Sequence, residues 1–138
     1  MDFNTVNDGL TVSGQITLEE VQILADKGFR TVIDNRPDEE VEGALQSEAM
    51  AQAVKAAGLN FLYLPIYPGQ FTGDLIDETK KAFAELDGPI YAYCRSGTRS
   101  VTAWALSQAG EQPAGDIMKQ AAGAGYDLSA IAGYLSGR

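Results

Sequence analysis

The sequence predicts an α/β fold with a mostly parallel central sheet of about four to five strands flanked by helices. Short runs of β-branched and aromatic residues alternate with amphipathic segments of helix length, and glycine or proline separates them. This alternation is typical of βαβ units, in which helices cover both faces of a parallel sheet. The 138 residues form a single predicted domain, 1–138, because domains usually run to about 100–150 residues.

The first half of the chain contains three candidate strands and two candidate helices. The strands are residues 10–13, 31–33 and 61–66. The first helix begins near Thr17, where Glu20 completes a capping box three residues later. The second covers Ala44 to Ala57, and Gly58 ends it.

The second half begins with a helix capped by Thr72 and carrying an apolar face as far as Leu86. A strand over 90–93 then runs directly into Cys94. The remaining segments predict helices over 100–109, 115–122 and 127–135. Ligands of such sheets bind beyond the carboxyl ends of the strands, so we expect residues 35–36, 67–69 and 94–100 on one edge.

Composition excludes several classes of function. Ten Lys and Arg against nineteen Asp and Glu give a net charge of −9, which disfavours nucleic acid and anionic membranes as partners. The absence of histidine excludes His-dependent catalysis and His-metal sites on this chain. A single cysteine excludes an intrachain disulfide, and no calcium-loop motif is visible. We therefore expect no metal and no cofactor, and a cytoplasmic location, since neither a signal peptide nor a membrane span is apparent.

One motif carries chemistry, the segment Cys94-Arg95-Ser96-Gly97-Thr98-Arg99-Ser100 between a predicted strand and a predicted helix. Backbone N–H groups of such a loop and the N-terminus of the following helix bind anions and favour a thiolate. Gly97 permits a tight turn, and the planar Arg99 guanidinium suits two oxygens of an oxyanion. We predict Cys94 and Arg99 as catalytic residues. The substrate-binding candidates are Arg95, Ser96, Gly97, Thr98, Ser100 and Arg36.

Three blocks of sequence together resemble the phosphatase-like domain family of bacterial beta-lactamase-hydrolase-like proteins. They are Ser13-Gly14-Gln15, residues 28–37 (GFRTVIDNRP) and residues 93–100 (YCRSGTRS). The resemblance covers residues 13 to about 135. It implies a scaffold similar to that of small dual-specificity phosphatases, together with a loop similar to that of rhodaneses.

The chain departs from the tyrosine-phosphatase pattern His-Cys-x5-Arg in three ways. Tyr93 replaces the histidine, and Arg99 follows Cys94 by five residues instead of six. The segment 67–70, where a phosphatase of this kind carries its acid, contains no carboxylate, and the next one is Asp74. All three departures favour sulfur chemistry, which expels a weakly basic group and needs no acid.

The sequence therefore favours a sulfurtransferase, in which Cys94 takes a sulfur from thiosulfate or a persulfide and passes it to a thiol acceptor. The alternative is a phosphatase that hydrolyses a phosphate ester through a phosphocysteine. A binding module without catalysis is disfavoured, because anion binding alone needs no thiol.

Several other residues carry two interpretations. Arg36 either binds substrate or pairs with Asp38 or Glu39. Asp74 and Asp77 suit the first turn of their helix, and a role as catalytic acid is the minority interpretation. The acidic run of residues 38–40 with Glu42 is expected on the solvated surface, and Val101 and Trp104 are expected in the core.

Overall fold

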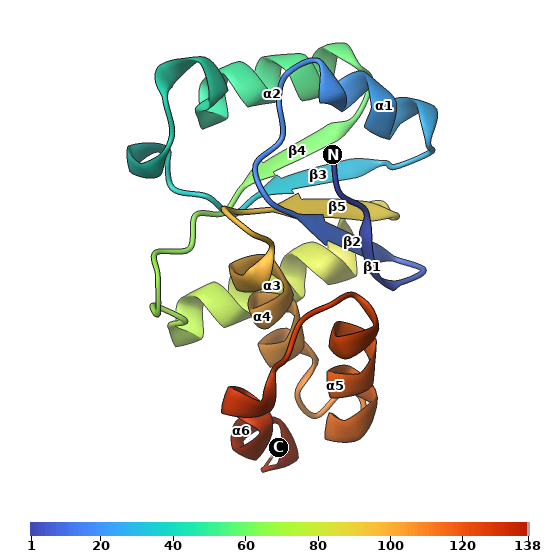
Figure 1. Ribbon diagram of the computed structural model, residues 1–138, viewed down its shortest axis with the longest axis vertical. Helices are drawn as coiled ribbons and strands as arrows, with labels where there is room; N and C mark the ends of the chain where they lie inside the picture. Colours follow the sequence, from blue (N-terminus) through green and yellow to red (C-terminus); the bar gives the residue numbers. More distant parts are fainter. Residues whose placement is uncertain (138) are drawn as a thin grey trace.

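The computed structural model describes residues 1–137, which form one five-stranded sheet in the order β1-β2-β5-β3-β4 (Figure 1). The strands are β1 (Asn4–Asn7), β2 (Leu10–Ser13), β3 (Thr31–Asp34), β4 (Asn60–Tyr63) and β5 (Ile90–Tyr93). Strands β2, β5, β3 and β4 are parallel, and β1 adds one antiparallel edge. The predicted mostly parallel sheet is confirmed, whereas strand β1 was not predicted.

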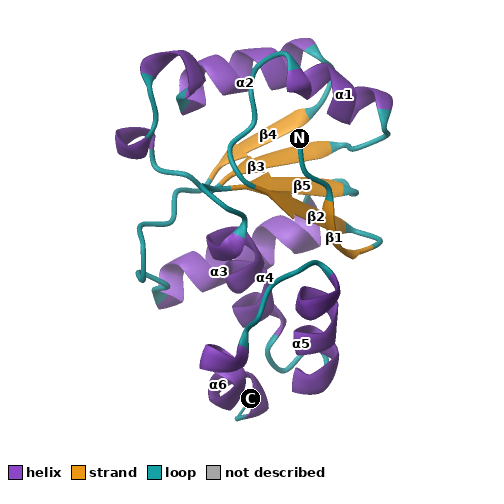
Figure 2. Ribbon diagram, viewed as in Figure 1, coloured by secondary structure: helices purple, strands orange, loops and turns teal. Residues whose placement is uncertain are grey.

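Helices cover both faces of the sheet, as predicted (Figure 2). They are α1 (Glu20–Asp26), α2 (Ser47–Ala56), α3 (Gly73–Glu85), α4 (Thr98–Gln108), α5 (Ala114–Gly123) and α6 (Ala132–Ser136). Helices α1 and α2 lie on one face and α3 and α4 on the other, with α5 and α6 beyond α4. The chain thus forms three layers, and a helical C-terminal segment extends the lower layer.

Alternation along the strands divides the core into two halves. Val32, Tyr91 and Tyr93 face α1 and α2, whereas Ile33 and Ala92 face α3 and α4. Val101 and Trp104 lie in the second half, as predicted, and are 0% and 3% exposed. Because β5 is buried on both faces, the residue that follows it is held by a rigid strand.

Helix caps explain where the structure agrees with the predicted boundaries and where it differs. Thr17 and Glu20 exchange the two hydrogen bonds of the predicted capping box, and Thr72 Oγ1 accepts from Leu75 N at the start of α3. Helix α2 begins at Ser47, not at residue 44, because the Asp38 carboxylate accepts from both the backbone N–H and the hydroxyl of Ser47. Residues 38–40 and 43–45 form short 3₁₀ turns instead.

The third predicted strand is shorter than expected. Strand β4 ends at Tyr63, although Leu64 N and Ile66 N still donate to Asp34 O and Asn35 O; Pro65 between them has no N–H with which to continue the ladder. None of the helices within residues 1–137 combines the length and apolar character needed to cross a membrane.

Candidate active site

The candidate site lies at the carboxyl edge of the parallel strands, where the sequence placed it. Cys94 follows β5 directly and is 1% exposed. Its backbone N–H donates to Ser13 O at the end of β2, and Asn35 N at the end of β3 donates to Tyr93 O. Three adjacent strands therefore hold the base of the loop that leads into α4.

The sulfur of Cys94 is contacted by a backbone donor of this loop. Gly97 N lies 3.1 Å from Cys94 Sγ and donates a hydrogen bond to it. Gly97 has φ +93°, a left-handed conformation that glycine adopts without strain, and α4 begins at the next residue. The N–H group and the positive end of the α4 dipole both stabilise negative charge on the sulfur.

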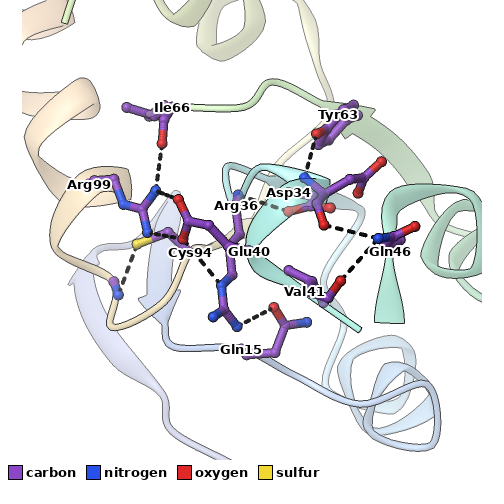
Figure 3. A network of polar contacts seen from close by, with 12 residues as sticks. Gln15, Asp34, Arg36, Glu40, Val41, Gln46, Tyr63, Ile66, Cys94 and Arg99 are labelled. Carbon is purple, nitrogen blue, oxygen red and sulfur yellow. Dashed lines mark hydrogen bonds and ion pairs between the residues drawn. The ribbon is translucent and has the colours of Figure 1, made fainter. Parts of the chain in front are cut away.

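Arg99 in the first turn of α4 is fixed by two acceptors. Its Nη1 and Nη2 donate to the two carboxylate oxygens of Glu40 at 2.9 and 2.7 Å, and Nη1 also donates to Ile66 O at 2.6 Å (Figure 3). Hydrogen bonds to Glu40 and, to a smaller degree, the nearby Cys94 raise the pKa of Arg99. The guanidinium is therefore positively charged, and its Nη1 and Nη2 atoms are held in place by Glu40 and Ile66.

These bonds leave one edge of the Arg99 guanidinium available. A guanidinium has five N–H groups, and the three bonds use both of Nη1 and one of Nη2. Nε–H and the second Nη2–H lie on the same side of the guanidinium plane and donate to no oxygen acceptor within residues 1–137, so this edge is left for the nearby Cys94 side chain and for a substrate. This pair of parallel donors matches two oxygens of a tetrahedral oxyanion.

Glu40 lies between two arginines, as Figure 3 shows. Its Oε1 is 3.5 Å from Arg36 Nε in addition to its bond with Arg99, and Arg36 Nη1 donates to Gln15 Oε1 at 3.2 Å. Hydrogen bonding to Arg99 lowers the pKa of Glu40. Glu40 therefore carries a full negative charge at neutral pH and belongs to the site.

The prediction of a solvated acidic run is confirmed only in part. Glu39 and Glu42 are exposed, but Glu40 is half-buried against Arg99, and Asp38 caps α2. Arg36 pairs with Glu40, not with Asp38 or Glu39. A signal for Glu40 did exist in the sequence, since it closely follows a strand whose carboxyl end lies on the ligand edge.

The other loop residues divide by exposure. Arg95, Ser96 and Thr98 are exposed, and the hydroxyl oxygens of Ser96 and Thr98 lie 3.1 Å apart. Ser100 is only 3% exposed, and its hydroxyl donates to Asn35 Oδ1 at 2.8 Å. The Ser100 hydroxyl thus joins α4 to the end of β3. Because its proton is donated to Asn35, it is not available to donate to a substrate.

Tyr126, which the sequence did not single out, also contacts the loop. Its hydroxyl donates to Ser96 O at 2.9 Å and accepts from Asn4 Nδ2 at 3.0 Å. Tyr126 follows α5 and lies 30 residues beyond Ser96, so no local sequence pattern indicates the contact. Its position depends entirely on how the C-terminal helices pack.

Asp74 and Asp77 were the sequence's candidates for a catalytic acid, and Asp34 at the end of β3 is a further carboxylate that the sequence did not single out. Asp34 is 2% exposed, accepts from Arg36 N at 2.9 Å, and has its pKa raised to about 6 by burial. Asp74 and Asp77 are exposed near the start of α3. No group of three or more metal-ligating side chains is found in the described part of the chain, residues 1–137.

Known proteins share both the sequence and the shape of this domain. A beta-lactamase hydrolase-like protein of Agrobacterium fabrum is 31% identical over 132 residues, which are 94% of this chain and 31% of that protein. A candidate phosphatase from Neisseria meningitidis superposes with a TM-score of 0.81 at 28% identity, covering 96% of this chain and 94% of the other. The catalytic domain of the PP-IP phosphatase SIW14 from S. cerevisiae, in complex with citrate, has a TM-score of 0.69 at 12% identity, with 96% and 83% coverage.

The match to a family model covers the cysteine loop and the sheet. The model is that of the beta-lactamase hydrolase-like protein, phosphatase-like domain, and it matches residues 2–111. This span contains the cysteine loop, Glu40 and all five strands. On sequence and structure alike, the chain belongs to the phosphatase-like domain family of beta-lactamase hydrolase-like proteins.

Proposed function

We propose that the domain hydrolyses phosphate esters through a covalent intermediate on Cys94. The thiolate attacks phosphorus, the S–P bond forms as the P–O bond breaks, and the leaving oxygen departs with the electron pair. Water then attacks the phosphocysteine, the S–P bond breaks, and inorganic phosphate and the thiolate result. The cysteine loop and Arg99 bind the phosphoryl group in both steps, so the same hydrogen-bond donors stabilise both transition states.

The free edge of Arg99 is the observation that carries this proposal. Glu40 and Ile66 hold the guanidinium so that the two donors not bonded to oxygen remain together, and this edge lies near Cys94, the single thiol of the sequence. Parallel donors stabilise the equatorial oxygens of a phosphoryl group as it is transferred. The candidate phosphatase from Neisseria meningitidis shares the fold at 28% identity, which supports the same chemistry here.

The carboxylates predict which phosphate esters are hydrolysed fastest. Glu40 contacts Arg99, but its lowered pKa leaves it without a proton to donate. Asp74 and Asp77 are exposed on α3 and make no hydrogen bond to the cysteine loop. We therefore propose substrates whose leaving group is already weakly basic, such as aryl phosphates and phosphoanhydrides.

Sulfur transfer is a second candidate, and the length of the loop favours it. Arg99 follows Cys94 by five residues, which gives a smaller cradle than the tyrosine-phosphatase pattern. In this reaction the Cys94 thiolate attacks the outer sulfur of thiosulfate, sulfite leaves, and the persulfide is passed to a thiol acceptor. The solved structures that share this fold are described as phosphatases and give no support to sulfur transfer, so sulfur transfer ranks second.

Intact mass spectrometry distinguishes the two reactions. After brief incubation with an aryl phosphate and rapid acid quenching, we expect a phosphoryl adduct on Cys94 and steady release of inorganic phosphate. The Cys94→Ser variant should release none. A single added sulfur after incubation with thiosulfate, without any phosphoryl adduct or phosphate release, would replace the phosphatase proposal by the sulfurtransferase.

A further inference from the structure

Two contacts described above belong to one peptide unit, the Ser96–Gly97 bond. Ser96 O is its carbonyl, which accepts from the Tyr126 hydroxyl at 2.9 Å. Gly97 N is its amide, which donates to Cys94 Sγ at 3.1 Å. Tyr126 and the sulfur therefore hold the two ends of the same planar group.

The geometry of a trans peptide couples these two contacts. The C=O and N–H of one unit point in opposite directions, because the group is planar. When Tyr126 holds the carbonyl on its own side, the N–H is directed to the other side, where the sulfur lies. A rotated peptide would instead direct a carbonyl oxygen at the thiolate, which repels negative charge.

The peptide needs such a restraint because Gly97 does not supply one. A glycine at φ +93° has several accessible conformations of similar energy, including those in which the preceding peptide is turned over. Ser96 is exposed, and no bond to its carbonyl other than that from Tyr126 is present within residues 1–137. Asn4 in β1 in turn holds the Tyr126 hydroxyl at 3.0 Å.

We infer that Tyr126 is a positioning residue that fixes the orientation of the Ser96–Gly97 peptide and thereby keeps the Gly97 N–H directed at the Cys94 sulfur. Tyr126 lies outside residues 2–111, which the family model matches. It acts through the loop and does not contact the reacting atoms. The inference rests on Cys94 being the nucleophile and applies to phosphorus and sulfur substrates alike.

The test is the pH profile of Cys94 alkylation by iodoacetamide in the Tyr126→Phe variant. Phenylalanine keeps the ring and removes the hydroxyl. We expect the midpoint of the profile to move to higher pH by about one unit, as expected for loss of a hydrogen bond to a charged group. We expect kcat/KM for an aryl phosphate to fall about tenfold in parallel.

Thr31→Val is the matched control. Thr31 also donates from its hydroxyl to a main-chain carbonyl, that of Asp87 at 2.7 Å, but at the amino end of β3, the opposite edge of the sheet from the cysteine loop. Its alkylation profile should equal that of the wild type even if its melting temperature falls. Asn4→Ala, which removes the donor to Tyr126, should shift the profile in the same direction as Tyr126→Phe but less.

Two results would overturn the inference: an unchanged alkylation profile in Tyr126→Phe, or an equal shift in Thr31→Val. Alkylation requires no substrate, so this test is independent of phosphate release. A shifted profile in a protein that releases no phosphate would refute the proposed phosphatase activity and leave the role of Tyr126 intact.

Discussion

At the scale of single residues, the space around Gly97 is the sharpest constraint in the site. A Cβ built on Gly97 would overlap the Tyr126 hydroxyl, and its φ of +93° is strained for any side chain. We expect Gly97→Ala to destabilise the protein by about 1–3 kcal/mol and to lower kcat/KM for an aryl phosphate by at least about 100-fold. Denaturant titration and initial rates measure the two effects.

Gly115→Ala is the control for this substitution. Gly115 lies inside α5, and a Cβ there would meet no neighbouring atom. Alanine should stabilise that helix by a few tenths of a kcal/mol to about 1 kcal/mol and leave activity unchanged. If Gly97→Ala behaves like Gly115→Ala, the loop is not constrained in the way described.

Glu40 provides a second residue-level prediction. Glu40→Gln keeps the shape of the side chain but removes the charge that holds Arg99 by two bonds, at 2.9 and 2.7 Å. We expect KM for an aryl phosphate to rise about tenfold, because a loosened guanidinium no longer presents its free edge in one orientation. Glu42→Gln, an exposed neighbour in the same segment, should change nothing. An increase in activity of Glu40→Gln would show instead that Glu40 competes with the substrate.

At the scale of elements, the segment between β3 and α2 carries Glu40, and Asp38 anchors that segment. The Asp38 carboxylate accepts two bonds from Ser47, both 2.7 Å long. We expect Asp38→Ala to cost about 1–2 kcal/mol in the free energy of unfolding and also to raise KM, because the cap and the segment loosen together. Thr72→Ala removes the cap of α3 at a similar cost. It should leave KM unchanged, and an equal rise in KM in both variants would contradict the prediction.

The helices and strands that were predicted from local sequence patterns agree with the structure. The features that were not predicted are contacts between residues far apart in the chain. The capping box at Thr17 and the strand at 90–93 depend on neighbouring residues, and both were predicted. The cysteine loop was located in the same way, since its strand, glycine and arginine are contiguous. Glu40 and Tyr126 reach their partners across 59 and 30 residues. The position of Glu40 after β3 indicates the ligand edge, but no local pattern identifies Arg99 or Ser96 as the partner. Strand β1 is short and pairs on one side only, which leaves little pattern to detect.

At the scale of the whole molecule, the buried Asp34 makes stability depend on pH. Burial raises its pKa from 3.8 to about 6, so the folded state binds a proton more tightly than the unfolded state. The free energy of unfolding should therefore fall as pH rises from about 4 to about 6, with the penalty complete above that. Asp34→Asn keeps an acceptor for Arg36 N and removes the charge.

We expect Asp34→Asn to be more stable than the wild type by about 3 kcal/mol at pH 7.5, with most of that gain lost near pH 4. Urea titrations at the two pH values measure this difference. Asp77→Asn, which removes an exposed carboxylate on α3, provides the baseline for the loss of one negative charge. A constant difference between Asp34→Asn and the wild type at both pH values would contradict the assignment.

The hydrogen bond from Tyr126 to Ser96 also bears on where this domain can be cut. The family model ends at residue 111, so a shortened chain made to that boundary would retain every strand and the whole cysteine loop. It would nevertheless lack Tyr126, whose hydroxyl holds the Ser96 carbonyl. An inactive fragment of this length would say little about the chemistry of the family, because it also loses Ile117 and Leu128 from the core and leaves the Ser96–Gly97 peptide unrestrained. Fragments intended for biochemical work should extend past residue 126.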